Sequence, residues 1–274
     1  MVALTCSYHR NMTHFYANNY WEELRNLRVR GKRPSLPAGT RIYAIGDIHG
    51  RLDLLNRLLQ RIEADIAGHP AERPIYVFLG DYIDRGESSC ATLNRLIEHA
   101  ETHETVFLRG NHEWIACNGL ADRGLFDQWL RLGGAATLSS YGISGALLAR
   151  KQVSELQAAF HRALPPAHIR FLRELRDSFE CGDFYFAHAG VNPNARLSQQ
   201  KQQDLLWIRD EFLMSDRDFG KIIVHGHTPR GEVEVRPNRI NIDTGAFATG
   251  RLTCLAIEGS ALAVIDTGLE LDRT

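Results

Sequence analysis

The chain has 274 residues, of which 44% are hydrophobic and 24% are charged, and this apolar content suffices for one large globular domain with appendages. Lysine and arginine number 32 against 33 for aspartate and glutamate, so no overall positive field exists to attract nucleic acid or an anionic membrane. The five cysteines form no CxxC pair, which is typical of reduced thiols, and no segment resembles a signal peptide or a membrane span, so we expect a cytoplasmic protein.

The first 38 residues differ in amino-acid composition from the rest of the chain. They are rich in Asn, Tyr and Arg and end in the stretch RGKRPSLPAGT, whose prolines and glycines are typical of a linker. We therefore interpret residues 1–38 as an arm or linker that carries a short helix over residues 20–27. Residues 39–274 are expected to form the main domain.

Strands and helices then alternate. Residues 41–46, 74–80 and 105–110 are apolar runs that predict strands. Apolar residues recur at helical spacing after Gly50, from Leu55 to Ile66, and again over residues 90–100. The order β-α-β-α-β predicts a parallel sheet with right-handed crossovers.

The second half of the chain predicts a different arrangement. Residues 114–180 read as a mainly helical insertion, interrupted by a segment rich in Gly, Ala and Ser at residues 132–146. Short strands are expected at residues 184–188, 221–227, 239–245, 252–258 and 261–265, and their spacing suggests a second, mixed sheet. The predicted fold is α/β, a layered β-sandwich of two mixed sheets flanked by helices.

Polar side chains follow the predicted strands at the points where the strands end. The stretch GDIHG contains Asp47 and His49, GDYIDRG contains Asp81, and RGNHE contains Asn111. Asp47 and Asp81 are 34 positions apart and Asp81 and Asn111 are 30 positions apart, each about one strand-helix-strand unit. The clusters are therefore expected to meet at the carboxyl edge of the sheet.

Later strand ends add His188 in FAHAG and His227 in VHGHTP. A donor set of carboxylates, imidazoles and one amide suits Mn, Fe, Zn, Co or Ni, with Mn expected first. The donors are too many for one ion. They predict two divalent metal ions that share a carboxylate at a separation of about 3.5–4 Å, an arrangement used for phosphate-ester chemistry.

The five ordered motifs GDIHG, GDYIDRG, RGNHE, FAHAG and GHTP resemble those of the calcineurin-like metallophosphoesterases. The exact sequences GDYIDRG and RGNHE resemble the motifs of their serine/threonine protein phosphatase branch. The resemblance covers roughly residues 40–258 and implies a β-sandwich flanked by helices. It assigns one metal to Asp47, His49 and Asp81. It assigns the second metal to Asp81 as the bridge, with Asn111, His188 and His227.

The resemblance also assigns residues to the chemistry. His112 would protonate the leaving alcohol and Asp84 would orient it, while Arg85 and Arg209 would clamp the phosphate oxygens beside Asn111 and His112. Each role is physically sensible, because a serine alkoxide leaves poorly without a proton and an arginine fork stays charged at any working pH. Pro229 stands where the wider superfamily often has a second histidine, which makes the nuclease members poorer models.

These observations predict a dinuclear metal-dependent phosphomonoesterase that acts on phosphoserine and phosphothreonine in proteins or peptides, with phosphotyrosine left open, by direct attack of a metal-activated hydroxide. A diadenosine polyphosphate hydrolase is the alternative enzyme, and a scaffold that has lost catalysis is the alternative from another class. The expected partner is a phosphorylated protein or peptide. The oligomeric state is left open.

Two assignments have competing interpretations. Arg209 could pair with Asp210 instead of binding phosphate. His225 and His227 would lie on the same face of a regular strand, but Gly226 between them lets the backbone turn or approach the metal closely, so we assign His227 as the ligand.

Arg109 and Glu113 are expected to pin their loop, and Trp114 and Trp207 to serve as core packing. The Gly-rich segment lacks the residues of a P-loop and could border the substrate groove.

Overall fold

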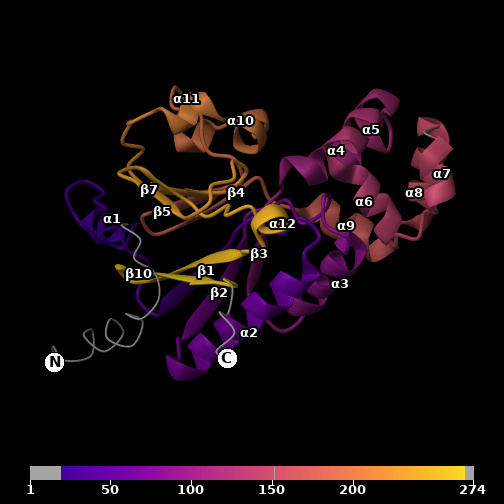
Figure 1. Cartoon of the computed structure of the whole chain (residues 1–274). Helices are drawn as coiled ribbons and strands as arrows, with labels where there is room; N and C mark the ends of the chain where they lie inside the picture. Colours follow the sequence, from indigo (N-terminus) through magenta and orange to yellow (C-terminus); the bar gives the residue numbers. More distant parts are fainter. Residues whose placement is uncertain (1–19, 151, 269–274) are drawn as a thin grey trace.

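The structure is a computed structural model that describes residues 20–150 and 152–268. Two five-stranded sheets stack face to face, and helices lie on the outer face of each (Figure 1). This confirms the predicted α/β sandwich of two mixed sheets. Residues 1–19, the first part of the predicted arm, lie outside the described residues.

The first sheet has the strand order β10-β9-β1-β2-β3. Its strands are β1 (Thr40–Ile45), β2 (Arg73–Phe78), β3 (Thr105–Phe107), β9 (Thr253–Glu258) and β10 (Ala261–Asp266). The predicted parallel pairing of β1, β2 and β3 is confirmed. The placement of the last two strands in the second sheet was wrong: β9 pairs antiparallel with β1, and β10 pairs with β9. An apolar run indicates a strand but does not specify the strand beside it.

The second sheet has the order β4-β5-β6-β8-β7. Its strands are β4 (Ser178–Cys181), β5 (Phe184–Ala187), β6 (Ile222–His225), β7 (Glu234–Arg236) and β8 (Arg239–Asn241). β5, β6 and β8 run parallel, and β4 and β7 close the sheet as antiparallel edges. The two edge strands are short and carry charged residues, so their sequence lacks the apolar run that indicates the inner strands.

The central strands are mainly apolar because both faces of each sheet are covered. In β1, Ile42 and Ala44 point into the core between the sheets, where they meet Phe186 and Val224. Tyr43 and Ile45 point to the opposite face and pack with the helices. All four β1 residues are fully buried.

Helices cover the two outer faces. α2 (Leu52–Gly68) and α3 (Ser89–Ala100) lie below the first sheet in Figure 1, and α10 (Gln202–Trp207) and α11 (Asp210–Leu213) lie above the second. A group of helices at one end of the sandwich occupies most of the predicted insertion: α4 (Asn111–Gly119), α5 (Arg123–Trp129), a π-helical turn (Leu130–Gly134), α6 (Ala135–Ser140), α7 (Gly145–Arg150), α8 (Val153–Ala163) and α9 (Pro166–Glu174). None of the described helices is long and apolar enough to cross a bilayer.

The described part of the predicted arm packs against the sandwich. The expected short helix is present as α1 (Tyr20–Asn26). Leu24, Leu27, Val29 and Leu36 are buried in the same core that fills the space between the sheets. The boundary at residue 38 stays a prediction.

A last short helix, α12 (Ala246–Thr249), follows β8 and lies at the centre of Figure 1.

Candidate metal centre

The predicted ligands come together at the carboxyl ends of the parallel strands, as the spacing indicated. Asp47 and His49 follow β1, and Asp81 follows β2. His188 and His227 follow β5 and β6 in the second sheet, so both sheets contribute. The predicted ligands are all buried: Asp47, His49, Asp81, Asn111, His188 and His227.

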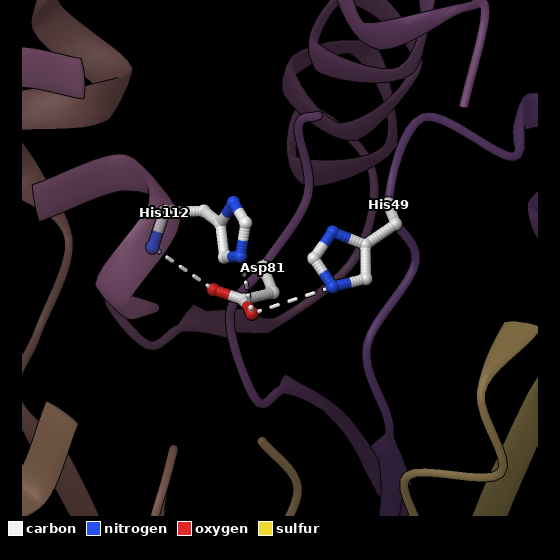
Figure 2. A group of neighbouring side chains, drawn as sticks. All are labelled: His49, Asp81 and His112. Carbon is white, nitrogen blue, oxygen red and sulfur yellow. Dashed lines mark hydrogen bonds and ion pairs between the residues drawn. The ribbon is translucent and has the colours of Figure 1, made fainter. Parts of the chain in front are cut away.

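A first group consists of His49, Asp81 and His112, whose possible ligand atoms all lie within 4.8 Å of one another. Nε2 of His49 is 3.4 Å from Oδ2 of Asp81, and Nε2 of His112 is 3.8 Å from the same oxygen. Figure 2 shows the two imidazole rings on either side of the Asp81 carboxylate. Distance alone therefore places His112 among the possible ligands, beside the residues assigned by the resemblance.

A second group consists of Asp81, His188 and His227, so Asp81 belongs to both groups. Nε2 of His188 is 3.4 Å from Oδ1 of Asp81 and 2.9 Å from Oδ1 of Asn111. Nδ1 of His227 is 2.9 Å from the same Asn111 oxygen. Two buried groups with one shared carboxylate fit a dinuclear site bridged by Asp81.

The hydrogen bonds of the histidines support this fit. Nδ1 of His49 is 2.9 Å from the carbonyl oxygen of Ile83, and Nδ1 of His188 is 2.9 Å from that of Leu79. Each Nδ1 therefore carries the proton and donates, which leaves a lone pair on Nε2 that faces Asp81. Nε2 of His188 faces Oδ1 of Asp81 and Oδ1 of Asn111, and a divalent metal ion between these acceptor atoms would satisfy all three.

The pKa values of the buried residues also favour metal binding. Burial lowers the pKa of His49 to about 3 and that of His227 to about 2, so both rings are neutral at pH 7, the form that binds metal. Burial, together with the nearby carboxylates of Asp243 and Asp81, raises the pKa of Asp47. Three buried carboxylates that repel one another are stabilised by bound cations.

The backbone around the centre is held in an unusual conformation. Six non-glycine residues of the described chain have a positive φ, and five of them lie here: His49, Asp81, Asp84, Arg85 and His227, with φ between 48° and 73°. Left-handed backbone costs a non-glycine residue about 1–2 kcal/mol. Such strain persists where surrounding contacts enforce it, and it concentrates at functional sites.

Glu113 supplies much of this restraint. Its buried carboxylate accepts hydrogen bonds from the backbone N–H groups of Asp81 (2.9 Å), Tyr82 (2.8 Å), Ile83 (3.2 Å) and Gly110 (3.0 Å). The predicted loop-pinning role of Glu113 is thus visible in its contacts. Arg109 donates to carbonyl oxygens at the end of α9 and pairs with Asp177, so it ties the same loop to α9.

His112 and Asp84 form a buried pair. Nδ1 of His112 is 2.7 Å from Oδ2 of Asp84, whose side chain is fully buried. Asp84 therefore contacts the ring of His112. Burial alone would lower the pKa of His112, but the carboxylates of Asp81 and Asp84 outweigh it and raise this pKa. A raised pKa is the direction that a general acid requires.

The two predicted phosphate-binding arginines are exposed at the opening of the site. NH1 of Arg85 is 3.0 Å from Nε2 of His49, and NH2 is 3.2 Å from Nε2 of His112, so the guanidinium spans both rings. Arg209 makes one side-chain hydrogen bond within the described residues, to Thr228 (3.4 Å), and no ion pair with Asp210 there. Its charge lies close enough to contribute to the lowered pKa of His188 and His227, after burial.

The two histidines of VHGHTP point in different directions. His225 is the last residue of β6 and contacts the ring of Phe212 on the outer face, at a centroid distance of 5.1 Å. Gly226 lets the backbone pass Asp47, because a Cβ there would lie 2.1 Å from Oδ1 of Asp47. His227 follows with a φ of 64° and belongs to the second donor group, whereas His225 belongs to neither.

Sequence reasoning missed one residue at the rim of the site. Phe247 in α12 is 38% exposed, and its ring lies 4.5 Å from Cζ of Arg85. No motif contains it. Trp114 and Trp207 are half-buried; Trp114 packs against the hydrophobic core, as expected, and the ring of Trp207 lies 6.3 Å from that of His227.

Comparisons with known proteins agree with this geometry. The family model described as calcineurin-like phosphoesterase matches residues 40–251. The chain is 27% identical over 234 residues to the bis(5'-nucleosyl)-tetraphosphatase PrpE (asymmetrical) of Anoxybacillus flavithermus, covering 77% of this chain and 88% of that protein. It is also 27% identical over 250 residues to the protein of the same name from Bacillus velezensis, covering 84% and 94%.

Among solved structures, the cold-active protein-tyrosine phosphatase of a psychrophilic Shewanella has the same fold. The TM-score is 0.57 with 17% identity, covering 84% of this chain and 80% of that one. The family model spans most of the chain and contains all the strand-end motifs. The chain therefore belongs to the calcineurin-like phosphoesterase family.

Proposed function

We propose that this metal-dependent phosphoesterase hydrolyses the phosphoanhydride chain of a dinucleoside polyphosphate such as diadenosine tetraphosphate. The observation that carries the proposal is the match to bis(5'-nucleosyl)-tetraphosphatases over 77% and 84% of this chain and 88% and 94% of theirs. This reverses the order of the two enzyme functions expected from the motifs, in which the phosphoprotein substrate came first.

The rim of the site supports a nucleotide substrate. Phe247 is an exposed aromatic ring directly beside Arg85. A base stacked on an aromatic side chain gains roughly 1–3 kcal/mol. A substrate whose phosphates bind Arg85 and Arg209 could therefore place one base against Phe247.

The chemistry is divided between the cations and the side chains. Two bound divalent ions, held by the six predicted ligands with Mn the expected metal, would lower the pKa of a water molecule and polarise the phosphoryl oxygens. Arg85 and Arg209 bind and orient the phosphate chain. His112 carries its proton toward the leaving group, and Asp84 keeps the other ring nitrogen protonated.

A second candidate is the dephosphorylation of proteins, and the pair of His112 and Asp84 favours it. A nucleotide phosphate is a good leaving group that needs little protonation, whereas the alkoxide of serine leaves poorly. A buried, oriented acid is thus of greatest use to a phosphoserine enzyme.

One experiment separates the two candidates. The protein is loaded with Mn²⁺, and kcat/KM is measured on diadenosine tetraphosphate and on a phosphoserine peptide, with the nucleotide products separated by chromatography. The proposal predicts at least about tenfold preference for the dinucleotide and unequal products, AMP and ATP. A preference of the same size for the peptide would replace the proposal with the second candidate.

A further inference from the structure

The buried carboxylate of Asp84 has more partners than His112. Oδ2 accepts a hydrogen bond from Nε1 of Trp129 (2.7 Å), and Oδ1 accepts one from Oγ1 of Thr137 (2.6 Å). Trp129 ends α5 and Thr137 lies in α6, so both donors come from the helical group beside the sandwich. The orientation of Asp84 is therefore set from outside its own loop.

Thr137 holds the backbone of Asp84 as well as its side chain. Oγ1 of Thr137 accepts the backbone N–H of Asp84 at 2.9 Å, and Oγ of Ser89 lies 3.0 Å from both Thr137 Oγ1 and the Asp84 nitrogen. Because the threonine hydroxyl has one proton and gives it to the carboxylate, Ser89 donates to Thr137. Every polar atom of this buried network then has a partner.

Residues 129–137 also contact Arg85. The carbonyl oxygen of Gly133 accepts the backbone N–H of Arg85 at 3.3 Å. Gly133 has a φ of 117°, and a Cβ there would lie 2.9 Å from Cγ of Arg85, so only glycine fits this close approach. The segment thus binds the backbone N–H groups of both Asp84 and Arg85, the consecutive residues with φ of 73° and 67°.

The carboxylate in turn fixes the ring of His112. Since Oδ2 accepts from Nδ1 of His112 and from Trp129 together, the imidazole is held at a set angle with its Nδ1–H directed at Asp84, and the proton for the leaving group is the one carried on Nε2. Nε2 then faces Asp81 and Arg85, where a leaving group would arrive.

We propose that Trp129 and Thr137 are positioning residues for catalysis: they hold Asp84 so that His112 presents Nε2 to the leaving group. Residues 129–137 therefore belong to the active site, because they position Asp84. This inference rests on the role of His112 as the acid in the proposed function.

The test compares two substrates that differ in their need for an acid, phenyl phosphate and p-nitrophenyl phosphate, with Mn²⁺-loaded protein. Thr137→Val removes the hydroxyl at nearly constant shape. It should lower kcat on phenyl phosphate by about tenfold or more and on p-nitrophenyl phosphate by less than about threefold, because protonation matters most for the poorer leaving group. KM and the number of bound Mn²⁺ ions should not change.

Matched variants separate positioning from general destabilisation. Thr137→Ser keeps a hydroxyl and should restore the wild-type ratio of the two rates, and Trp129→Phe should alter the ratio as Thr137→Val does. Tyr141→Phe, next to the same helix, removes a 2.7 Å hydrogen bond to His168 without contact to Asp84, and should leave the ratio unchanged.

His112→Asn identifies which step of the reasoning fails. If His112→Asn alters the ratio and Thr137→Val does not, the positioning role is refuted while the acid role stands. If His112→Asn itself lowers both rates equally, the acid role is refuted and the positioning role with it.

Discussion

Glu113→Gln is the substitution whose cost can be worked out most directly from the contacts. Oε2 of Glu113 accepts the backbone N–H groups of Asp81 and Gly110, and Oε1 accepts those of Tyr82 and Ile83. Glutamine keeps one acceptor oxygen, but its NH₂ group would face the other two donors. Two buried N–H groups then lose their acceptor.

Each buried group left without a partner costs about 1–3 kcal/mol. The substitution should therefore lower the free energy of unfolding by about 2–6 kcal/mol, a large part of the 5–15 kcal/mol of a typical domain. In urea, with a slope of about 2–3 kcal/mol per molar, the midpoint should fall by about 0.7–3 M.

The assay is urea unfolding of chelator-treated protein, so that metal binding does not contribute. Glu104→Gln is the control, because Glu104 is exposed and pairs with Arg73 at the surface, where such a pair is worth less than about 1 kcal/mol. If Glu113→Gln unfolded at the same urea concentration as Glu104→Gln, the loop around Asp81 would not depend on this carboxylate.

Three further changes test separate parts of the account. His227→Ala should remove about one metal equivalent and nearly all activity, while His225→Ala keeps both metals; elemental analysis decides, and the reverse result would exchange their roles. Phe247→Ala should raise KM for diadenosine tetraphosphate by about tenfold, from the loss of one stacked base, and leave KM for p-nitrophenyl phosphate within about twofold; equal changes on both would exclude base stacking. Burial, with the charges of His103 and Arg95, lowers the pKa of His99 to about 3. Below pH 6.5 the unfolded chain therefore binds a proton at this histidine that the folded chain does not bind. The free energy of unfolding consequently decreases as the pH falls. His99→Leu should reduce this loss by up to about 1.4 kcal/mol per pH unit in urea titrations between pH 6.5 and 4, and parallel curves for variant and wild type would contradict it.

The strands could be predicted where both faces are buried, because such strands contain an apolar run, as in residues 42–45 of β1 and 75–78 of β2. The edge strands β4 and β7 could not, since residues such as Glu180 and Glu234 interrupt any apolar run. The partner of β9 could not be predicted either, because pairing with β1 joins residues more than 200 positions apart.

The donor residues of the site could be predicted because each follows a strand within a short motif. Their supports could not. Trp129 and Thr137 contact Asp84 across 45 and 53 residues of sequence, and no local pattern encodes such contacts. The positive φ at His49, Asp81 and His227 is equally absent from the sequence, since none of these residues is a glycine.

The claim that Asp81 bridges two metal ions is tested most directly by counting metal. The protein is stripped with chelator, reloaded with Mn²⁺ and submitted to elemental analysis, and p-nitrophenyl phosphate hydrolysis is measured at each stage. The account predicts two equivalents of Mn²⁺ per chain, activity that disappears on stripping and returns on reloading, and a loss at both sites in Asp81→Asn. Full activity in exhaustively stripped protein, or two equivalents retained in Asp81→Asn, would contradict it.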